Sequence, residues 1–175
     1  ISMALNQNVP VISGTTGWLE RYNEAIKQCE LTKGAFLYAS NFSVGVNLFF
    51  ELNKQLAKMM QQFDNYQISM EEIHHTKKLD APSGTAITLA EGIIENTKKT
   101  SWSLDATNSN ETIPITAKRI PEVPGTHLVS YDSNVDCIEI KHTAHNRKGF
   151  ALGAVVAAEW IIGKQGIFSM KDVLN

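Results

Sequence analysis

Cationic and titratable side chains gather within a few residues near the middle of this chain. The four are His74, His75, Lys77 and Lys78, and the segment they open ends with Asp80-Ala81-Pro82-Ser83-Gly84-Thr85. Groups of this kind packed closely together raise one another's cost of ionisation, and a bound dianion relieves that cost. The segment therefore predicts a site for a small, doubly charged anion.

The residues that close this segment add a second kind of anion ligand. Ser83, Gly84 and Thr85 open a predicted helix, whose first backbone N–H groups have no partner within the helix. Gly84 also permits an anion to approach the backbone closely. On the alternative, structural interpretation, Asp80 and Ser83 cap a helix beside a solvated loop. We favour the anion site, because a cap requires neither two adjacent histidines nor a cluster of cations.

A metal centre is the competing functional interpretation. His142 and His145 are three residues apart, and with His74 and His75 they offer four imidazoles. Adjacent histidines at a strand end point to opposite faces, however, and His142 is in register with apolar residues of its own strand. We therefore rank a metal centre behind the anion site and expect no metal.

A second candidate binding segment lies near the start of the chain. Gly14-Thr15-Thr16-Gly17 follows the apolar run Val9 to Ser13 and suits backbone contact with a nucleotide at the carboxyl end of a parallel strand. Most such loops are ordinary turns between a strand and a helix, so this signal is weak by itself. No G-x-G-x-x-G segment is present, so no dinucleotide fingerprint supports it.

The order of predicted elements shows what positions these segments. A strand at 9–13, a helix at 18–30 and a strand at 35–39 form a βαβ unit, which is typical of a parallel sheet. The middle of the chain is predicted to contain a helix after Ser43, a strand at 66–73, a helix from 83 or 84 to 98, a surface loop at 99–111, and strands at 112–120, 127–132 and 135–142. A helix and a short tail at 166–175 end the chain.

The composition is that of a folded protein with little net charge. Apolar residues make up 43% of the chain, and the net charge of −2 argues against a general nucleic-acid partner. Two cysteines are too few for a disulfide framework, which favours a reducing compartment. The apolar run at 150–163 is shorter than the roughly 20 residues of a membrane-spanning helix, and no secretory signal is visible. We expect a cytoplasmic protein without a membrane partner, whose natural start is missing or processed, since the chain opens on Ile1.

The segment from Glu72 to Ala86 also carries a family resemblance. It reads E-x-H-H-x-x-K-x-D-A-P-S-G-T-A without a gap, and so many fixed positions make the match highly specific. Gly14 to Gly17 and Asn41 to Asn47 agree in order and context. On these residues the sequence resembles the dihydrodipicolinate reductases of diaminopimelate and lysine biosynthesis, over nearly its whole length.

The resemblance implies an oxidoreductase that uses NADH or NADPH. Its substrate would be a cyclic dicarboxylic imine or the 4-hydroxy precursor of that imine, and its product tetrahydrodipicolinate. Hydride addition leaves an electron-rich enamine that must be protonated, and a nearby cation both donates the proton and stabilises the charge. The resemblance assigns His74 and Lys78 as the acid/base pair, with Lys78 the stronger candidate for proton donor, and leaves open which of the two delivers the proton.

The same resemblance implies the binding residues. Substrate would be held by His75, Ser83, Gly84 and Thr85. The cofactor would be contacted by Gly14, Thr15, Thr16, Ala39, Ser40, Asn41 and Phe42. Arg147 is a further candidate for holding the substrate or a domain interface.

The resemblance implies a fold in three stretches of sequence. Residues 1–40 would be the C-terminal part of an α/β, Rossmann-type nucleotide-binding domain, to which residues 149–175 return. Residues 41–148 would form an α+β substrate-binding and oligomerisation domain with a mixed, mostly open sheet, assembled into a homotetramer. The family's first strand and glycine-rich loop are not in the sequence, so we expect a truncated chain with little reductase activity. The alternative is a non-catalytic dicarboxylate-binding module.

Overall fold

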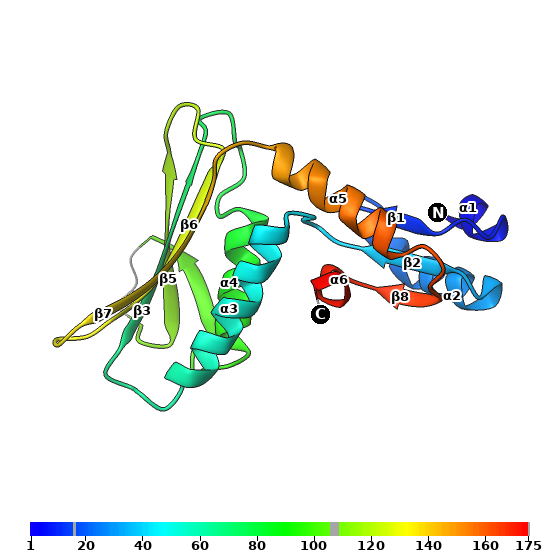
Figure 1. Cartoon of the computed structure of the whole chain (residues 1–175). Coiled ribbons are helices and arrows are strands. Elements are labelled where there is room, and N and C mark those ends of the chain that lie inside the picture. Colours follow the sequence, from blue (N-terminus) through cyan, green and yellow to red (C-terminus); the bar gives the residue numbers. More distant parts are fainter. Residues whose placement is uncertain (16, 106–108, 175) are drawn as a thin grey trace. The chain divides into compact units, whose positions relative to one another are not determined.

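The computed structural model describes residues 1–15, 17–105 and 109–174. The chain divides into two compact units, one made of Ile1–Asn47 with Lys148–Asn175 and the other of Leu48–Arg147. Figure 1 shows both units, with most of their elements labelled. Within the described ranges, no helix combines the length and the apolar character that crossing a bilayer requires.

A parallel sheet organises the first unit. Its strands are β1 (Val11–Ser13), β2 (Ala35–Tyr38) and β8 (Gly166–Phe168), in the order β1-β2-β8. The short helix η1 (Leu19–Arg21) and helix α2 (Tyr22–Thr32) connect β1 to β2, which confirms the predicted βαβ unit. The first three residues of β2 are buried, as expected for the central strand of a parallel sheet.

The prediction of a tail at 166–175 is wrong. It contains β8, which pairs in parallel with β2, and helix α6 (Met170–Leu174). A three-residue strand has too little periodicity to be detected, and pairing with a strand some 130 residues earlier stabilises it. The other helices of this unit are α1 (Ser2–Asn6), which was not predicted, and α5 (Lys148–Trp160), which was.

A mixed sheet forms the second unit, in the strand order β4-β5-β3-β6-β7. The strands are β3 (Gln67–His74), β4 (Ser101–Leu104), β5 (Thr112–Arg119), β6 (Gly125–Asp132) and β7 (Cys137–Ala144). Strand β3 is parallel to β5 and antiparallel to β6, so the expected mixed, open sheet is confirmed.

The prediction of a surface loop at 99–111 is also wrong in part. Strand β4 lies within it and pairs in parallel with β5, from Ser101↔Thr112 to Leu104↔Ile115. Its Ser-rich sequence conceals the strand, because an edge strand is stabilised by backbone pairing with its neighbour rather than by an apolar pattern. Residues 106–108 of the predicted loop lie outside the described residues.

Helices α3 (Val44–Met60) and α4 (Gly84–Ile94) lie on one face of the mixed sheet (Figure 1). The core between these layers includes Phe49, Ala57, Leu89, Ile93, Ile113, Ile115, Val129 and Tyr131. Helix α4 ends four residues before the predicted end at Lys98. There the side chains of Asn96 and Thr97 donate hydrogen bonds to the carbonyls of Gly92 and Ile93, which gives the last turn polar partners.

Candidate active site

Strand β3 ends in two polar residues that point toward the helices. Glu72 and His74 are two residues apart and therefore lie on the same face of the strand. Glu72 is completely buried, and only 8% of His74 is exposed. Ser83 then begins α4 as its N-cap, because its Oγ accepts a hydrogen bond from the N–H of Ala86 at 3.2 Å. The predicted helix start is confirmed.

The carboxylate of Glu72 is the centre of a hydrogen-bond network. Its Oε2 accepts from the backbone N–H of Ser83 at 2.9 Å, and its Oε1 accepts from Nη2 of Arg119 at 3.1 Å. His74 Nδ1 and His127 Nε2 lie 3.5 and 3.8 Å from Oε2. One buried carboxylate thus faces a guanidinium, a helix start and two imidazoles.

Strand pairing brings these residues together. His127 on β6 is the register partner of Glu72, and Arg119 on β5 is the register partner of His74. Sequence reasoning included Glu72 only as part of the signature and missed both Arg119 and His127. For His127 the available signal was a polar residue on the apolar face that includes Val129 and Tyr131.

The network sets the charge of its members. Burial alone would raise the pKa of Glu72, but hydrogen bonds from Ser83, the charge of His74 and a hydrogen bond from Arg119 outweigh it, and the pKa is lowered. Burial lowers the pKa of His74, against the opposing effect of Glu72. Burial, reinforced by the charge of His74, lowers the pKa of His127 to about 4. Glu72 is therefore ionised and His127 neutral at pH 7.

The same cluster has the composition of a metal site. Glu72, His74 and His127 offer ligand atoms within 4.8 Å of one another, and zinc uses such sets. The carboxylate, however, already accepts from Ser83 and Arg119, and a dication would lie beside the guanidinium, where like charges repel. The contacts favour a hydrogen-bond network.

The four histidines that the sequence offered as a metal site do not form this cluster. Of those four residues, the cluster includes His74 alone. The His142 ring lies beside the Phe49 ring, with centroids 5.9 Å apart, and burial lowers its pKa. This is the packing that the register of His142 with its apolar neighbours indicated.

The loop between β3 and α4 carries the predicted proton donor. Lys78 Nζ lies 2.7 Å from Oδ2 of Asp80, and this contact lowers the pKa of the Asp80 carboxyl. Nη2 of Arg119 also donates to the backbone carbonyl of Asp80 at 2.7 Å, which ties the loop to β5. The Lys78 charge contributes to the lowered pKa of His74, so the two residues of the predicted acid/base pair interact electrostatically.

The predicted substrate-binding residues surround the start of α4. His75 and Thr85 are half-buried, Ser83 is buried, and Gly84 is exposed. A Cβ atom at Gly84 would meet no atom within 4 Å, so the backbone at this helix start is open to a ligand. The geometry is suited to a carboxylate held by backbone N–H groups.

In the first unit, several predicted cofactor residues lie at one edge of the parallel sheet. Gly14 and Thr15 follow β1, and residues 39–42 follow β2, so both segments leave the carboxyl ends of neighbouring strands. A Cβ atom at Gly14 would lie 3.0 Å from the Phe42 ring and 3.8 Å from the Ala39 carbonyl. Ser40 is exposed, and Asn41 accepts a hydrogen bond from the N–H of Ser43 at 2.9 Å. Thr16 lies outside the described residues.

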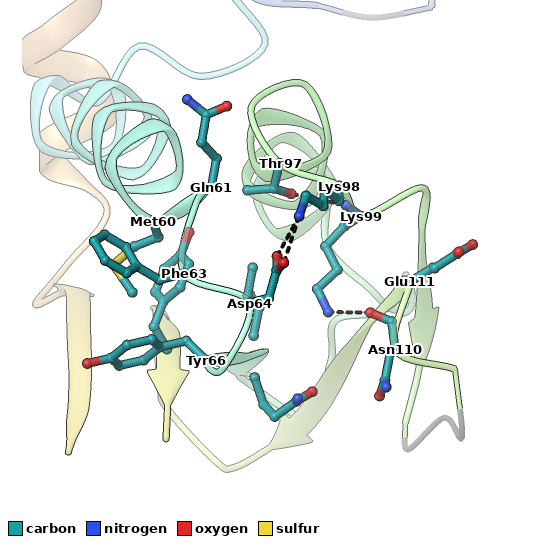
Figure 2. A pocket seen from close by; sticks show the side chains of 13 residues that line it. Met60, Gln61, Phe63, Asp64, Tyr66, Thr97, Lys98, Lys99, Asn110 and Glu111 are labelled. Atoms are coloured by element: carbon teal, nitrogen blue, oxygen red, sulfur yellow. Dashed lines mark hydrogen bonds and ion pairs between the residues drawn. The ribbon is translucent and has the colours of Figure 1, made fainter. Parts of the chain in front are cut away.

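A separate pocket of about 330 Å³ lies at the other end of β3 (Figure 2). An ion pair between Asp64 and Lys98 crosses it, and Lys99 donates to the carbonyl of Asn110. Gln67, the first residue of β3, lines this pocket, whereas His74 is the last. Eight residues of extended chain separate the two ends by roughly 25 Å, so the pocket does not belong to the site around Glu72.

Fold and site together define a two-unit α/β protein with a carboxylate-centred histidine network. Comparison with known proteins identifies its relatives. The family model described as "Dihydrodipicolinate reductase, C-terminus" matches residues 45–174. The chain therefore belongs to the dihydrodipicolinate reductase family.

Individual relatives extend this likeness along the whole chain. A 4-hydroxy-tetrahydrodipicolinate reductase of Christiangramia forsetii is 58% identical over all of this chain and 73% of the relative. One of Methanoculleus marisnigri is 35% identical over all of this chain and 70% of the relative. The dipicolinate-bound dihydrodipicolinate reductase of Paenisporosarcina sp. TG-14 shares the fold, with a TM-score of 0.75 at 23% identity over 96% of this chain and 66% of that one.

Proposed function

We propose that this chain provides the substrate site of a 4-hydroxy-tetrahydrodipicolinate reductase. The reaction is the reduction of 4-hydroxy-tetrahydrodipicolinate, or of its dehydrated imine, to tetrahydrodipicolinate at the expense of NADH or NADPH. The observation that carries the proposal is the single network formed by the signature segment, in which Glu72 joins His74 to the start of α4. Family membership supports the same conclusion.

The proposed roles follow from charge and position. One carboxylate of the substrate is bound by the free N–H groups at Gly84 and Thr85, with His75 and Ser83 beside them. After hydride transfer from the cofactor, the enamine takes a proton from the pair His74 and Lys78, with Lys78 the stronger candidate. Dipicolinate, bound in the related Paenisporosarcina structure, is a planar dicarboxylate and supports this substrate class.

The cofactor and assembly proposals rest on other parts of the chain. The nicotinamide half of NADH or NADPH is assigned to the carboxyl edge of the parallel sheet, at Gly14 to Thr16 and Ala39 to Phe42. This is the edge at which open α/β sheets bind ligands. The mixed sheet is assigned to contacts between subunits of a homotetramer.

Calorimetric titration with pyridine-2,6-dicarboxylate tests the substrate site directly. We expect saturable binding with one ligand per chain, weakened about tenfold or more in Lys78→Ala, because a charge-assisted contact is removed. Lys77→Ala is the matched control, since it removes the same charge from the exposed neighbouring position. Equal loss in both variants, or no saturable binding by the folded chain, contradicts the proposal.

A further inference from the structure

The His74 ring has two different edges. Its Nδ1 is buried and makes no hydrogen bond to any residue that the structure describes, and it lies 3.5 Å from Glu72 Oε2. A carboxylate only accepts hydrogen bonds, so a lone pair on Nδ1 would face negative charge, whereas a proton there would be attracted. Glu72 therefore favours the form of neutral His74 that carries its proton on Nδ1.

The opposite edge of the ring lies beside a glycine. A Cβ atom at Gly125 would lie 3.2 Å from Nε2 of His74, closer than side-chain contacts normally allow. Any larger residue at this position would cover Nε2 or displace the ring. With glycine there, no side chain at position 125 covers Nε2, and among the described residues Nε2, unlike Nδ1, is not a buried atom without a partner, so it is the nitrogen left for proton exchange.

The same carboxylate also holds the backbone around the anion site. Glu72 accepts from the N–H of Ser83, the residue that begins α4. It accepts from Arg119 as well, and Arg119 in turn donates to the carbonyl of Asp80 in the preceding loop. One side chain thus connects the His74 ring, the helix start and the loop that carries Lys78.

We propose that Glu72 is the positioning residue of this site, holding the proton of neutral His74 on Nδ1 while fixing the start of α4, so that Nε2 is the nitrogen that exchanges a proton with the substrate. When imidazolium His74 releases the proton on Nε2, the neutral ring that remains already carries its proton on Nδ1 beside Glu72. No rearrangement of the network is then needed. The part of the inference that concerns the substrate rests on the proposed function.

The state of the ring can be measured in the unaltered protein. Long-range proton–nitrogen NMR spectra of the full chain, labelled with ¹⁵N and recorded at pH 8, distinguish a protonated from an unprotonated ring nitrogen. We expect Nδ1 of His74 to be the protonated nitrogen and Nε2 the unprotonated one. A neutral His74 with its proton on Nε2 overturns the proposal without any variant being needed.

Variants separate positioning from a merely structural role. Glu72→Gln replaces one oxygen by an N–H donor, and we expect it to move the His74 proton to Nε2 and to weaken pyridine-2,6-dicarboxylate binding about tenfold or more. Glu71→Gln makes the same change at the next residue, on the opposite face of β3 and paired with Lys118, and is expected to do neither. Weakened binding in Glu72→Gln with the proton still on Nδ1 overturns the proposal.

Two further outcomes are distinguishable. If the unaltered chain does not bind the dicarboxylate but its His74 proton moves in Glu72→Gln, then the proposed function fails and the positioning role stands. If Glu72→Gln does not fold, Glu72→Asp keeps the negative charge on a shorter side chain and is expected to keep the proton on Nδ1. A proton on Nε2 in that variant counts against the proposal.

Discussion

A single buried anion explains the chemistry at the residue scale. Glu72 is surrounded by Arg119, two imidazoles and a backbone N–H, so its charge is compensated although the residue is completely buried. Burial of an unpaired carboxylate would be far more costly. Both histidines are buried beside it, with His74 Nδ1 3.5 Å and His127 Nε2 3.8 Å from Oε2, and burial holds His127 neutral.

His127 makes stability depend on pH. Its folded pKa, about 4, lies below its unfolded value near 6.5, so the unfolded chain binds more protons between these values. The stability that neutral His127 contributes is therefore fully present above about pH 6.5 and is lost as the pH falls toward 4. At about 1.4 kcal/mol per pKa unit, the loss is on the order of 3 kcal/mol. His74, whose pKa is also lowered, contributes with the same sign.

Urea unfolding at pH 7 and at pH 4.5 measures this dependence. We expect a smaller free energy of unfolding at pH 4.5, and His127→Gln is expected to reduce the difference between the two pH values. His145→Gln changes an exposed histidine and is the control. A pH dependence unchanged in His127→Gln would show that His127 is not its source.

At the scale of elements, short contacts between neighbouring elements hold the segments that carry the site. In the second unit, β3, the 75–82 loop and α4 are consecutive. The hydrogen bond from the Ser83 N–H to Glu72 ties the end of β3 to the start of α4. In the first unit, α5 packs against the segment after β2. A Cβ atom at Gly153 would lie 1.7 Å from the backbone oxygen of Phe42, so only glycine fits there.

Gly153→Ala is therefore expected to destabilise the first unit. The new methyl group would clash with backbone rather than with a movable side chain, and overpacking of this kind costs about 3 kcal/mol. Gly149→Ala is the matched control on the same helix, because its Cβ would meet Ser43 Oγ at an ordinary 3.8 Å. Thermal unfolding compares the two. An equal melting temperature in both variants would refute the close contact.

At the scale of the whole molecule, the mixed sheet has an uncovered face. Helices α3 and α4 lie on one side in Figure 1, and no helix of the described second unit lies on the other. Ser69, Glu71, Pro114, Thr116, Leu128 and Ser130 line a shallow depression there. This face is the surface that the proposed homotetramer would bury.

Leu128→Lys tests that assembly. A lysine repeated across a buried, symmetric interface brings like charges together, so we expect a lower mass by multi-angle light scattering than for the unaltered protein. Within one subunit position 128 is paired with Glu71 on β3 and with Lys141 on β7, so thermal unfolding of the variant checks that the fold is retained. Leu31→Lys, at an exposed position on α2, is the control. An unaltered protein that is monomeric contradicts the tetramer.

Local sequence patterns predicted much of the molecule. The βαβ unit, helices α3 to α5 and strands β3 and β5 to β7 follow from periodicity, caps and turn residues, which act between near neighbours. The signature segment likewise predicted the family and a site between β3 and α4. Roles for individual residues, including His74, Lys78 and the cofactor loops, stay predictions.

Two short strands and the neighbours of Glu72 were decided by the tertiary structure alone. Strands β4 and β8 exist because pairing with another strand satisfies their backbone groups. The partner of β4 is β5, eleven residues later, and that of β8 is β2, some 130 residues earlier. Glu72 becomes the centre of a site because strand register places Arg119 and His127 beside it, 47 and 55 residues later in the chain. Pairing register is a property of two strands and the core between them, so neither segment by itself carries it. The sequence by itself therefore determined the kind of protein and its reactive segment, and the tertiary structure determined which side chains control that segment.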